Sequence, residues 1–207
     1  MSIRLVQIKK CKTYQSAVIF VHFLIKTYNE RMSNKEKYNP NIHHRKSIRL
    51  QGYDYSQAGL YFITILTDDR QHLFGTVSNG VMALHTAGEV AQNCWLEIPN
   101  HYPSTVLHEF VVMPNHIHGI IELTTMQYDK NRNAFQDTIS KSIGSIIRGY
   151  KIGVTKWVRQ NTSIQTVWHK NFYENIIRDA NAYHLISEYI INNPVNWQND
   201  GFYATAE

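Results

Sequence analysis

The sequence is poor in cysteine, with only Cys11 and Cys94 among its 207 residues. Two cysteines without a CxxC spacing exclude a disulfide framework and a cysteine-rich zinc site, and they favour a reducing cytoplasm. No apolar run reaches the roughly 18 residues that a membrane-spanning helix needs, so no membrane association is expected. Internal repeats and low-complexity tracts are also missing. A hydrophobic content of 43% therefore predicts one globular domain with a substantial core.

Acidic residues are scarce at the start of the chain. The first 50 positions hold 11 Lys and Arg but only 2 Asp and Glu. The remaining positions hold 10 Lys and Arg and 14 Asp and Glu. Residues 138–178 are basic again, with Glu174 as their one acidic residue. Two basic segments favour a phosphate-rich partner such as a nucleic acid. A solvated face and a solvated tail would give the same composition, so charge alone leaves both open.

The basic N-terminal segment, residues 1–37, is interpreted as an extension preceding a domain at residues 38–207. Its apolar stretch at 16–25 lacks the small-residue cleavage site of a secretory signal. The run that opens at Met32, MSNKEKYNPNIHHRKS, is typical of a protein N-terminus. We therefore expect residues 1–31 to result from a start codon assigned too early, and mass spectrometry of the native N-terminus would test this.

The pattern of apolar residues predicts an α+β fold. The expected elements are a strand at 59–67, a hairpin within 73–84, a helix at 86–98, strands at 105–113 and 116–123, a helix at about 138–159, a strand within 164–178 and a helix at 180–192. We expect the 86–98 helix to begin with a capping box of Thr86 and Glu89 and to end at Pro99. Gly149 and Gly153 should weaken the 138–159 helix.

This order of elements is that of a ferredoxin-like antiparallel sheet with helices packed on one face. The two strands on either side of Pro114-Asn115 should then pair with each other. Their pairing places the 116–123 strand near the centre of the sheet, where its apolar residues would be buried.

Two histidines interrupt the apolar run EFVVMPNHIHGIIEL, at positions 116 and 118. Strand side chains alternate between faces, so His116 and His118 should project to the same side, about 6–7 Å apart. Two imidazoles on a rigid strand form half of a metal site. Histidines that only make local hydrogen bonds would leave the same pattern, so the pair alone does not decide.

The segment MPNHIHGII resembles the HUH motif (His, hydrophobic, His) of single-stranded DNA nucleases. From about Tyr38 to Trp197 the chain resembles the REP-associated tyrosine transposases, a branch of the single-tyrosine HUH transposases. The resemblance also rests on residues 43–65, 143–157 and 189–197, the last reading YIINNPVNW. It implies the HUH endonuclease fold and a cytoplasmic protein that is nucleoid-associated when bound to DNA.

The resemblance also implies a catalytic set. In that family a tyrosine of the last helix cleaves DNA through a 5′-phosphotyrosine intermediate, and its position corresponds to Tyr189. His116, His118 and Asn193 would hold Mg²⁺ or Mn²⁺. The spacing of four residues places Tyr189 and Asn193 on the same face of a helix.

The sequence around Tyr189 also suits a purely structural tyrosine, because its neighbours on the helix are apolar. Tyr173 and Tyr183 are rival nucleophiles, although Tyr173 lacks an amide four residues later and Tyr183 has Ser187 there. The residues alone therefore leave the choice between a core tyrosine and a nucleophile open.

The implied partner is single-stranded DNA carrying a palindromic hairpin. The candidate phosphate contacts are Lys46, Arg49, Lys141, Arg148, Lys151 and Lys156. Tyr53, Tyr55 and Trp157 are candidates for stacking on unpaired bases. A domesticated hairpin-binding protein without turnover and a replication initiator of the HUH class are the alternatives. A homodimer and a monomer are both compatible with the sequence.

Overall fold

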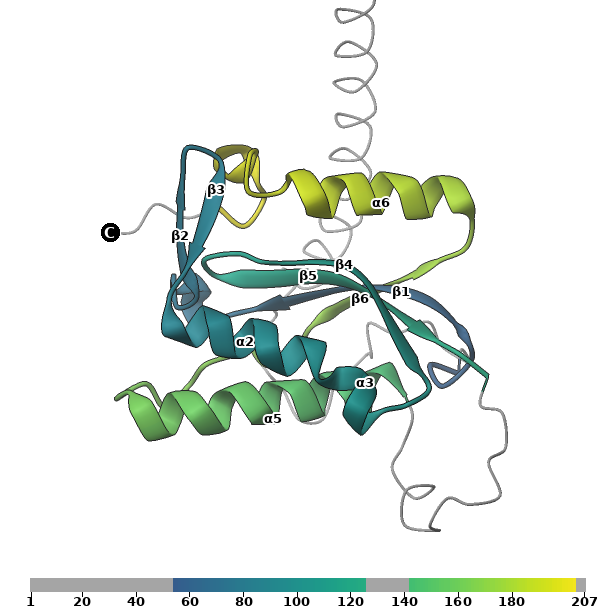
Figure 1. Cartoon of the computed structure of the whole chain (residues 1–207), viewed down its shortest axis with the longest axis horizontal. Coiled ribbons are helices and arrows are strands. Elements are labelled where there is room, and N and C mark those ends of the chain that lie inside the picture. Colours follow the sequence, from purple (N-terminus) through teal and green to yellow (C-terminus); the bar gives the residue numbers. More distant parts are fainter. Residues whose placement is uncertain (1–53, 126–141, 204–207) are drawn as a thin grey trace, which may run out of the picture. The chain divides into compact units, whose positions relative to one another are not determined.

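A four-stranded antiparallel sheet organises the protein (Figure 1). The computed structural model describes residues 54–125 and 142–203, so the predicted extension at 1–37 lies outside the described residues. The sheet has the order β4-β5-β1-β6, with β1 at Gly59–Leu66, β4 at Thr105–Val112, β5 at His116–Leu123 and β6 at Tyr173–Ile177. Each neighbouring pair is antiparallel. This is the ferredoxin-like order, and the predicted α+β fold is confirmed.

Strands β1 and β5 occupy the centre of the sheet, where nearly all of their residues are buried. Ile63 and Ile65 of β1 and Ile117 of β5 are fully buried. Ile65 pairs with Ile117, and Ile63 pairs with Gly119. The predicted pairing of the strands around Pro114-Asn115 is also observed, as β4 with β5.

Helices cover both faces of this sheet. Helices α2 (Thr86–Leu96), α3 (Ile98–His101) and α5 (Ile143–Asn161) lie on one face, as expected, and α6 (Ala180–Asn192) lies on the other (Figure 1). Position 119 of β5 faces α2, because a Cβ on Gly119 would lie 2.4 Å from Cζ2 of Trp95, a residue of α2. The opposite face of the sheet is covered by α6, whose Ile186 and Ile190 are fully buried.

Helix α5 runs without a break through both of its inner glycines. Its N-cap is Ser142, whose hydroxyl accepts a hydrogen bond from the Ser145 N–H at 3.3 Å. Gly149 allows close packing, since a Cβ there would lie 2.6 Å from the Tyr102 hydroxyl oxygen. That hydroxyl donates to the Ser145 carbonyl at 3.1 Å. The cost of glycine in the helix is thus partly offset by a tertiary contact.

The structure corrects two expectations near residue 86. Helix α2 begins at Thr86, but its N-cap is His85 and makes no side-chain cap, so the predicted capping box is wrong. Pro99 does not end this helix, because α2 already ends at Leu96 and Pro99 lies in the first turn of α3. Proline is tolerated there since N–H groups of a first turn have no partner within the helix.

The predicted hairpin is observed, whereas two short 3-10 helices were not predicted. Strands β2 (Gly75–Ser78) and β3 (Val81–Leu84) form the predicted hairpin, with positive φ at Asn79 and Gly80. Two short 3-10 helices, η1 (Asp68–Arg70) and η2 (Trp197–Asn199), complete the described chain. Among the described residues, no helix has both the length and the apolar character to span a bilayer.

Candidate active site

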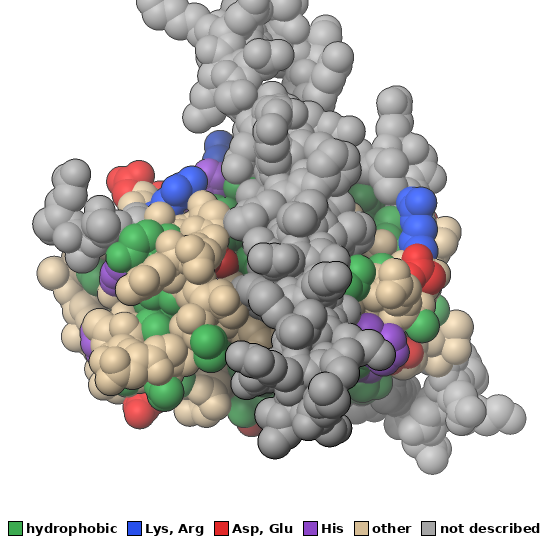
Figure 2. All heavy atoms as spheres, turned by 90° about the horizontal axis from the view of Figure 1, so that it is seen from above, with side chains coloured by type: hydrophobic (Ala, Val, Ile, Leu, Met, Phe, Trp, Pro, Cys, Tyr) green, Lys and Arg blue, Asp and Glu red, His purple; other side chains and the backbone are tan. Residues whose placement is uncertain are grey.

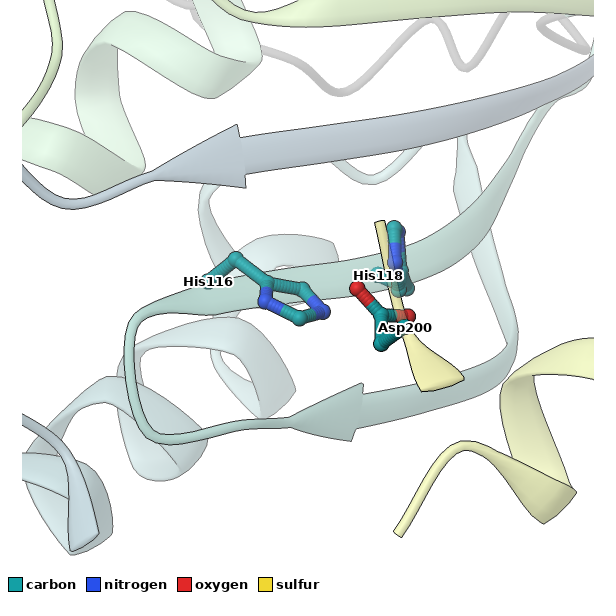
Figure 3. A group of neighbouring side chains, drawn as sticks. All are labelled: His116, His118 and Asp200. Atoms are coloured by element: carbon teal, nitrogen blue, oxygen red, sulfur yellow. The ribbon is translucent and has the colours of Figure 1, made fainter. Parts of the chain in front are cut away.

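The two histidines of β5 lie side by side on the sheet face that α6 covers. Both side chains are fully buried, and their ring centroids are 4.4 Å apart. Figure 3 shows the His116 ring directed toward Asp200, which belongs to the segment after α6. The projection of both imidazoles to one side, expected from the strand period, is therefore observed.

A hydrogen bond fixes the orientation of each imidazole. His116 Nδ1 lies 2.8 Å from the side-chain oxygen of Asn115, whose NH₂ group donates to the Phe202 carbonyl at 2.9 Å. Because an amide oxygen only accepts, Nδ1 of His116 carries the proton and Nε2 keeps a lone pair. His118 Nδ1 lies 2.7 Å from the Thr64 hydroxyl, on the neighbouring strand. Such partners orient metal-binding imidazoles.

Burial keeps both histidines neutral near pH 7. It lowers the pKa of His116 to about 4, and the Asp200 carboxylate only partly opposes the shift. Burial, reinforced by His116, also holds the pKa of His118 well below its ordinary value. Neutral imidazole is the form that binds metals, so the pair is ready to act as ligands.

Tyr189 brings a hydroxyl group from α6 to this pair. Its side chain is 1% exposed, and its oxygen lies 3.3 Å from His118 Nε2. The hydroxyl donates to an Asp200 carboxylate oxygen at 2.8 Å, and the ring packs edge-on against Phe62. Tyr189 is thus buried as a core tyrosine would be, but its hydroxyl lies in a polar centre that includes His116, His118 and Asp200.

Asn193 reaches the same place from the C-cap of α6. Its NH₂ group donates to the Asp200 carboxylate at 2.7 Å. Its side-chain oxygen is buried, and so is His116 Nε2; neither atom has a hydrogen-bond partner within the described residues. The structure therefore brings together all four residues predicted for the centre: His116, His118, Tyr189 and Asn193. Their chemical roles stay predictions.

Asp200 is a member of the centre that the sequence did not indicate. One ligand atom from each of His116, His118 and Asp200 lies within 4.8 Å of the others. Burial raises the pKa of this carboxyl, but the two histidines and hydrogen bonds from the Phe202 N–H and Asn193 outweigh it, so the pKa is lowered. In sequence, Asp200 stands in the polar run WQNDGFY, which is typical of a surface turn.

The rival tyrosines occupy different positions. Tyr183 donates to Glu109 at 3.0 Å and lies 3.2 Å from His108 Nδ1, in a second polar cluster under α6. Tyr173 pairs with Thr64 on the histidine face, and its ring lies 6.0 Å from Phe202. Tyr173 is therefore at the rim of the centre and Tyr183 is part of another cluster.

The predicted DNA contacts of the long helix lie across the sheet from the histidines (Figure 1). Arg148 and Lys156 are exposed on α5. The Lys151 ammonium instead donates to two backbone carbonyls, both at 3.0 Å, and burial lowers its pKa to about 8.

Tyr55 is buried, so it does not present its ring for base stacking. Lys46, Arg49, Lys141 and Tyr53 lie outside the described residues.

On the α6 side, the described surface that stays visible in Figure 2 shows no gathered positive charge. In Figure 2, Lys and Arg side chains are few and separate over the described surface left visible. The six predicted phosphate contacts thus remain predictions, and Lys151 has a structural role in addition.

Comparison with known proteins finds two similar proteins of known sequence. No protein-family model matches the chain. An uncharacterised protein of Haemophilus influenzae is 45% identical over 176 residues, covering 81% of this chain and 98% of that protein. A second Haemophilus influenzae protein, assigned to the REP-associated tyrosine transposases, is 28% identical over 148 residues, which are 69% of this chain and 73% of that protein.

A solved structure has the same fold. It is a REP-associated tyrosine transposase bound to a REP hairpin, with a TM-score of 0.51 and 20% identity over 75% of this chain and 76% of that one. In sequence the chain is similar to a REP-associated tyrosine transposase, and it shares the fold of a solved one. The comparisons support the predicted resemblance, and the roles of the histidine pair, Tyr189 and Asn193 stay predictions.

Proposed function

We propose that this REP-associated tyrosine transposase homologue is a metal-dependent endonuclease and strand transferase acting on single-stranded DNA beside hairpins. The observation that carries the proposal is the Tyr189 hydroxyl, buried 3.3 Å from Nε2 of His118. The hairpin in the solved relative supports the same class of substrate here. A sugar–phosphate backbone bound at this centre would be exposed to an oxygen nucleophile and two neutral imidazoles.

The residues present fit a divalent cation. Two buried acceptors, His116 Nε2 and the Asn193 side-chain oxygen, have no hydrogen-bond partner within the described ranges. Together with His118 they would hold Mg²⁺ or Mn²⁺, of which Mn²⁺ suits imidazole ligands better. When bound, the cation would supply Lewis-acid stabilisation of the charge that develops on the scissile phosphate.

Tyr189 then supplies the covalent chemistry. Its oxygen forms a bond to phosphorus while the bond from phosphorus to the 3′ oxygen breaks, leaving a 5′-phosphotyrosine and a free 3′-hydroxyl. The phenol loses one proton and the departing oxygen gains one. The new ester has about the same energy as the phosphodiester it replaces, so attack by another 3′-hydroxyl rejoins strands without ATP.

An adduct assay tests this function. The probe is a pool of end-labelled single-stranded oligonucleotides, each with a hairpin beside a randomised tetranucleotide, incubated with and without Mn²⁺. Wild-type protein should give a covalent adduct that resists denaturation and requires Mn²⁺. Tyr189→Phe should give none while binding the hairpin normally, and Tyr183→Phe, altered outside the histidine pair, should react like wild type.

Two outcomes would contradict the proposal. Hairpin binding without any adduct from the wild-type protein would favour a domesticated binding protein. An adduct that survives Tyr189→Phe would place the nucleophile elsewhere, with Tyr173 as the nearest candidate on the same face of the sheet.

A further inference from the structure

The segment that follows α6, residues 197–203, is packed against the histidine strand. Trp197 and Phe202 are buried, and their rings lie 5.8 and 5.1 Å from the ring of His116. The Asn115 side chain donates to the Phe202 carbonyl at 2.9 Å. Residue 200 is therefore held at the centre by apolar contacts on both sides of it in the chain.

Three donors fix the carboxylate of Asp200. The Phe202 N–H bonds one oxygen at 2.7 Å. The other oxygen receives the Tyr189 hydroxyl at 2.8 Å and the Asn193 NH₂ group at 2.7 Å. This second oxygen therefore contacts both the proposed nucleophile and an amide proposed as a ligand.

The ligand set that the family resemblance implies lacks an anionic oxygen. Two imidazoles and one amide are a poor set for Mg²⁺ and a modest one for Mn²⁺, since both prefer carboxylate oxygens. The structure places such a carboxylate beside the imidazoles, with ligand atoms of the three residues within 4.8 Å of one another. Burial of two neutral rings against one carboxylate leaves a net negative site that suits a cation.

We propose that Asp200 is a metal-binding residue of this centre and that its carboxylate completes the ligand set of His116 and His118. This deepens the proposed function and rests on it for the reaction, although not for the binding of the ion. The donated hydrogen bond of Asn193 fixes the carboxylate and leaves the amide oxygen as an acceptor. Asp200 thereby links the ion to the hydroxyl of Tyr189.

Metal affinity, measured without DNA, tests this assignment. Mn²⁺ is titrated into wild type, Asp200→Asn and Glu109→Gln, and free Mn²⁺ is followed by electron paramagnetic resonance. Asp200→Asn keeps the size of the side chain but loses its charge, so we expect Kd to rise at least about tenfold. Glu109 is the matched control, because it accepts hydrogen bonds from Tyr183 and Ser187 of α6 outside the histidine pair. Its variant should bind like wild type.

A spectroscopic measurement separates ligation from support of the fold. Co²⁺ bound to the wild-type protein should show visible absorption that changes in energy and intensity with Asp200→Asn, but not with Glu109→Gln. Should Asp200→Asn fail to fold, Asp200→Glu keeps the charge and should still bind Mn²⁺ with a shifted Co²⁺ spectrum.

Unchanged Mn²⁺ affinity and an unchanged Co²⁺ spectrum in a folded Asp200 variant would overturn the assignment. Faster adduct formation by Asp200→Asn than by wild type would also overturn it, since the carboxylate would then obstruct the centre. Asp200-dependent Mn²⁺ binding by a wild-type protein that forms no adduct would contradict the proposed function alone.

Discussion

At the residue scale, the neighbours of each histidine decide what the pair can do. Asn115 and Thr64 each contact an Nδ1 atom, which directs Nε2 of both rings toward α6 and the segment after it. Phe62 and Phe202 pack against the two rings, and the Tyr189 hydroxyl lies 3.3 Å from His118 Nε2.

Replacing Thr64 should weaken metal binding although Thr64 is not a proposed ligand. Thr64→Val keeps the β-branched shape but removes the hydroxyl 2.7 Å from His118 Nδ1, so the ring loses its fixed orientation. Loss of such a partner typically costs about 10-fold to 100-fold in affinity. Mn²⁺ titration measures the effect, and Thr64→Ser, which keeps the hydroxyl, should stay close to wild type. Equal affinity in both variants would exclude this orienting role.

Protonation of His116 should make the metal-free protein less stable in acid. Its folded pKa of about 4 lies below the ordinary value of 6.5 because of burial. Between these values the unfolded chain binds the proton and the folded chain does not, so the free energy of unfolding falls as pH decreases from 6.5 to 4. The loss from His116 should be on the order of 3 kcal/mol.

Urea unfolding at several pH values, with a chelator present, measures this dependence. His116→Asn should flatten the curve over the same pH range because the buried titrating ring is gone. A wild-type protein whose stability does not change between pH 6.5 and 4 would contradict the burial of a neutral His116.

The sequence indicated four members of the centre and missed the fifth for a physical reason. The strand period predicted that His116 and His118 project to the same side. Helical spacing, together with the family resemblance, predicted that Tyr189 and Asn193 join them. Asp200 has no such period to read, because it lies beyond α6 in an irregular segment. Its place depends on the packing of Trp197 and Phe202, which only the fold shows.

At the element scale, strand β5 serves the core on one face and the centre on the other. Gly119 illustrates the core face, because its lack of a side chain lets the fully buried Trp95 lie against the strand. On the other face, His118 pairs with Thr64 of β1, and Thr64 in turn pairs with Tyr173 of β6. The position of the histidines is thus set by the packing behind them.

Adding one methyl group to β5 should destabilise the fold. Gly119→Ala would place Cβ 2.4 Å from Trp95 and 3.0 Å from Phe110, which must move apart. Overpacking of this kind costs about 1–3 kcal/mol.

In Gly153→Ala the nearest atom is Cys94 Sγ at 3.4 Å, so the gain in helix propensity should dominate and stabilise α5 by about 0.5–1 kcal/mol. Thermal unfolding of both variants measures the two effects, and a stable Gly119→Ala protein would contradict this packing.

Helix and strand positions were predictable, but irregular features inside them were not. The long apolar patterns gave β5 and α6 with their observed bounds. The register shift in β4 between Leu107 and Phe110 had no sequence signal, and it lets the consecutive residues His108 and Glu109 both contact Tyr183 of α6. The capping box at Thr86 failed because a short motif is decided by the local path of the chain.

At the scale of the whole described protein, the sheet separates a structural face from a chemical one. Helices α2, α3 and α5 pack on one side, and α6 closes the centre on the other (Figure 1). The sequence predicted the ferredoxin-like order but grouped the helices on one face. An amphipathic pattern shows that a helix buries one side, and it does not show which face of the sheet that side meets.

The exposed cations of α5 allow a test of the predicted DNA contacts. Replacing Arg148 and Lys156 by Gln should weaken hairpin binding and reduce the slope of log K against log salt by about 2, if each contacts a phosphate. Mn²⁺ affinity should not change, because both lie across the sheet from the histidines. Arg178→Gln serves as an exposed charge control. Unchanged hairpin binding in the double variant would exclude α5 from the DNA interface.

Identification of the residue that carries the DNA tests the central claim most directly. The covalent adduct formed with Mn²⁺ and hairpin DNA would be digested with protease and nuclease, and the modified peptide sequenced by tandem mass spectrometry. We predict a nucleotide joined through a 5′-phosphate to Tyr189, in the peptide containing EYIINNP. A nucleotide on Tyr173, on Tyr183 or on any other residue would contradict the proposed mechanism.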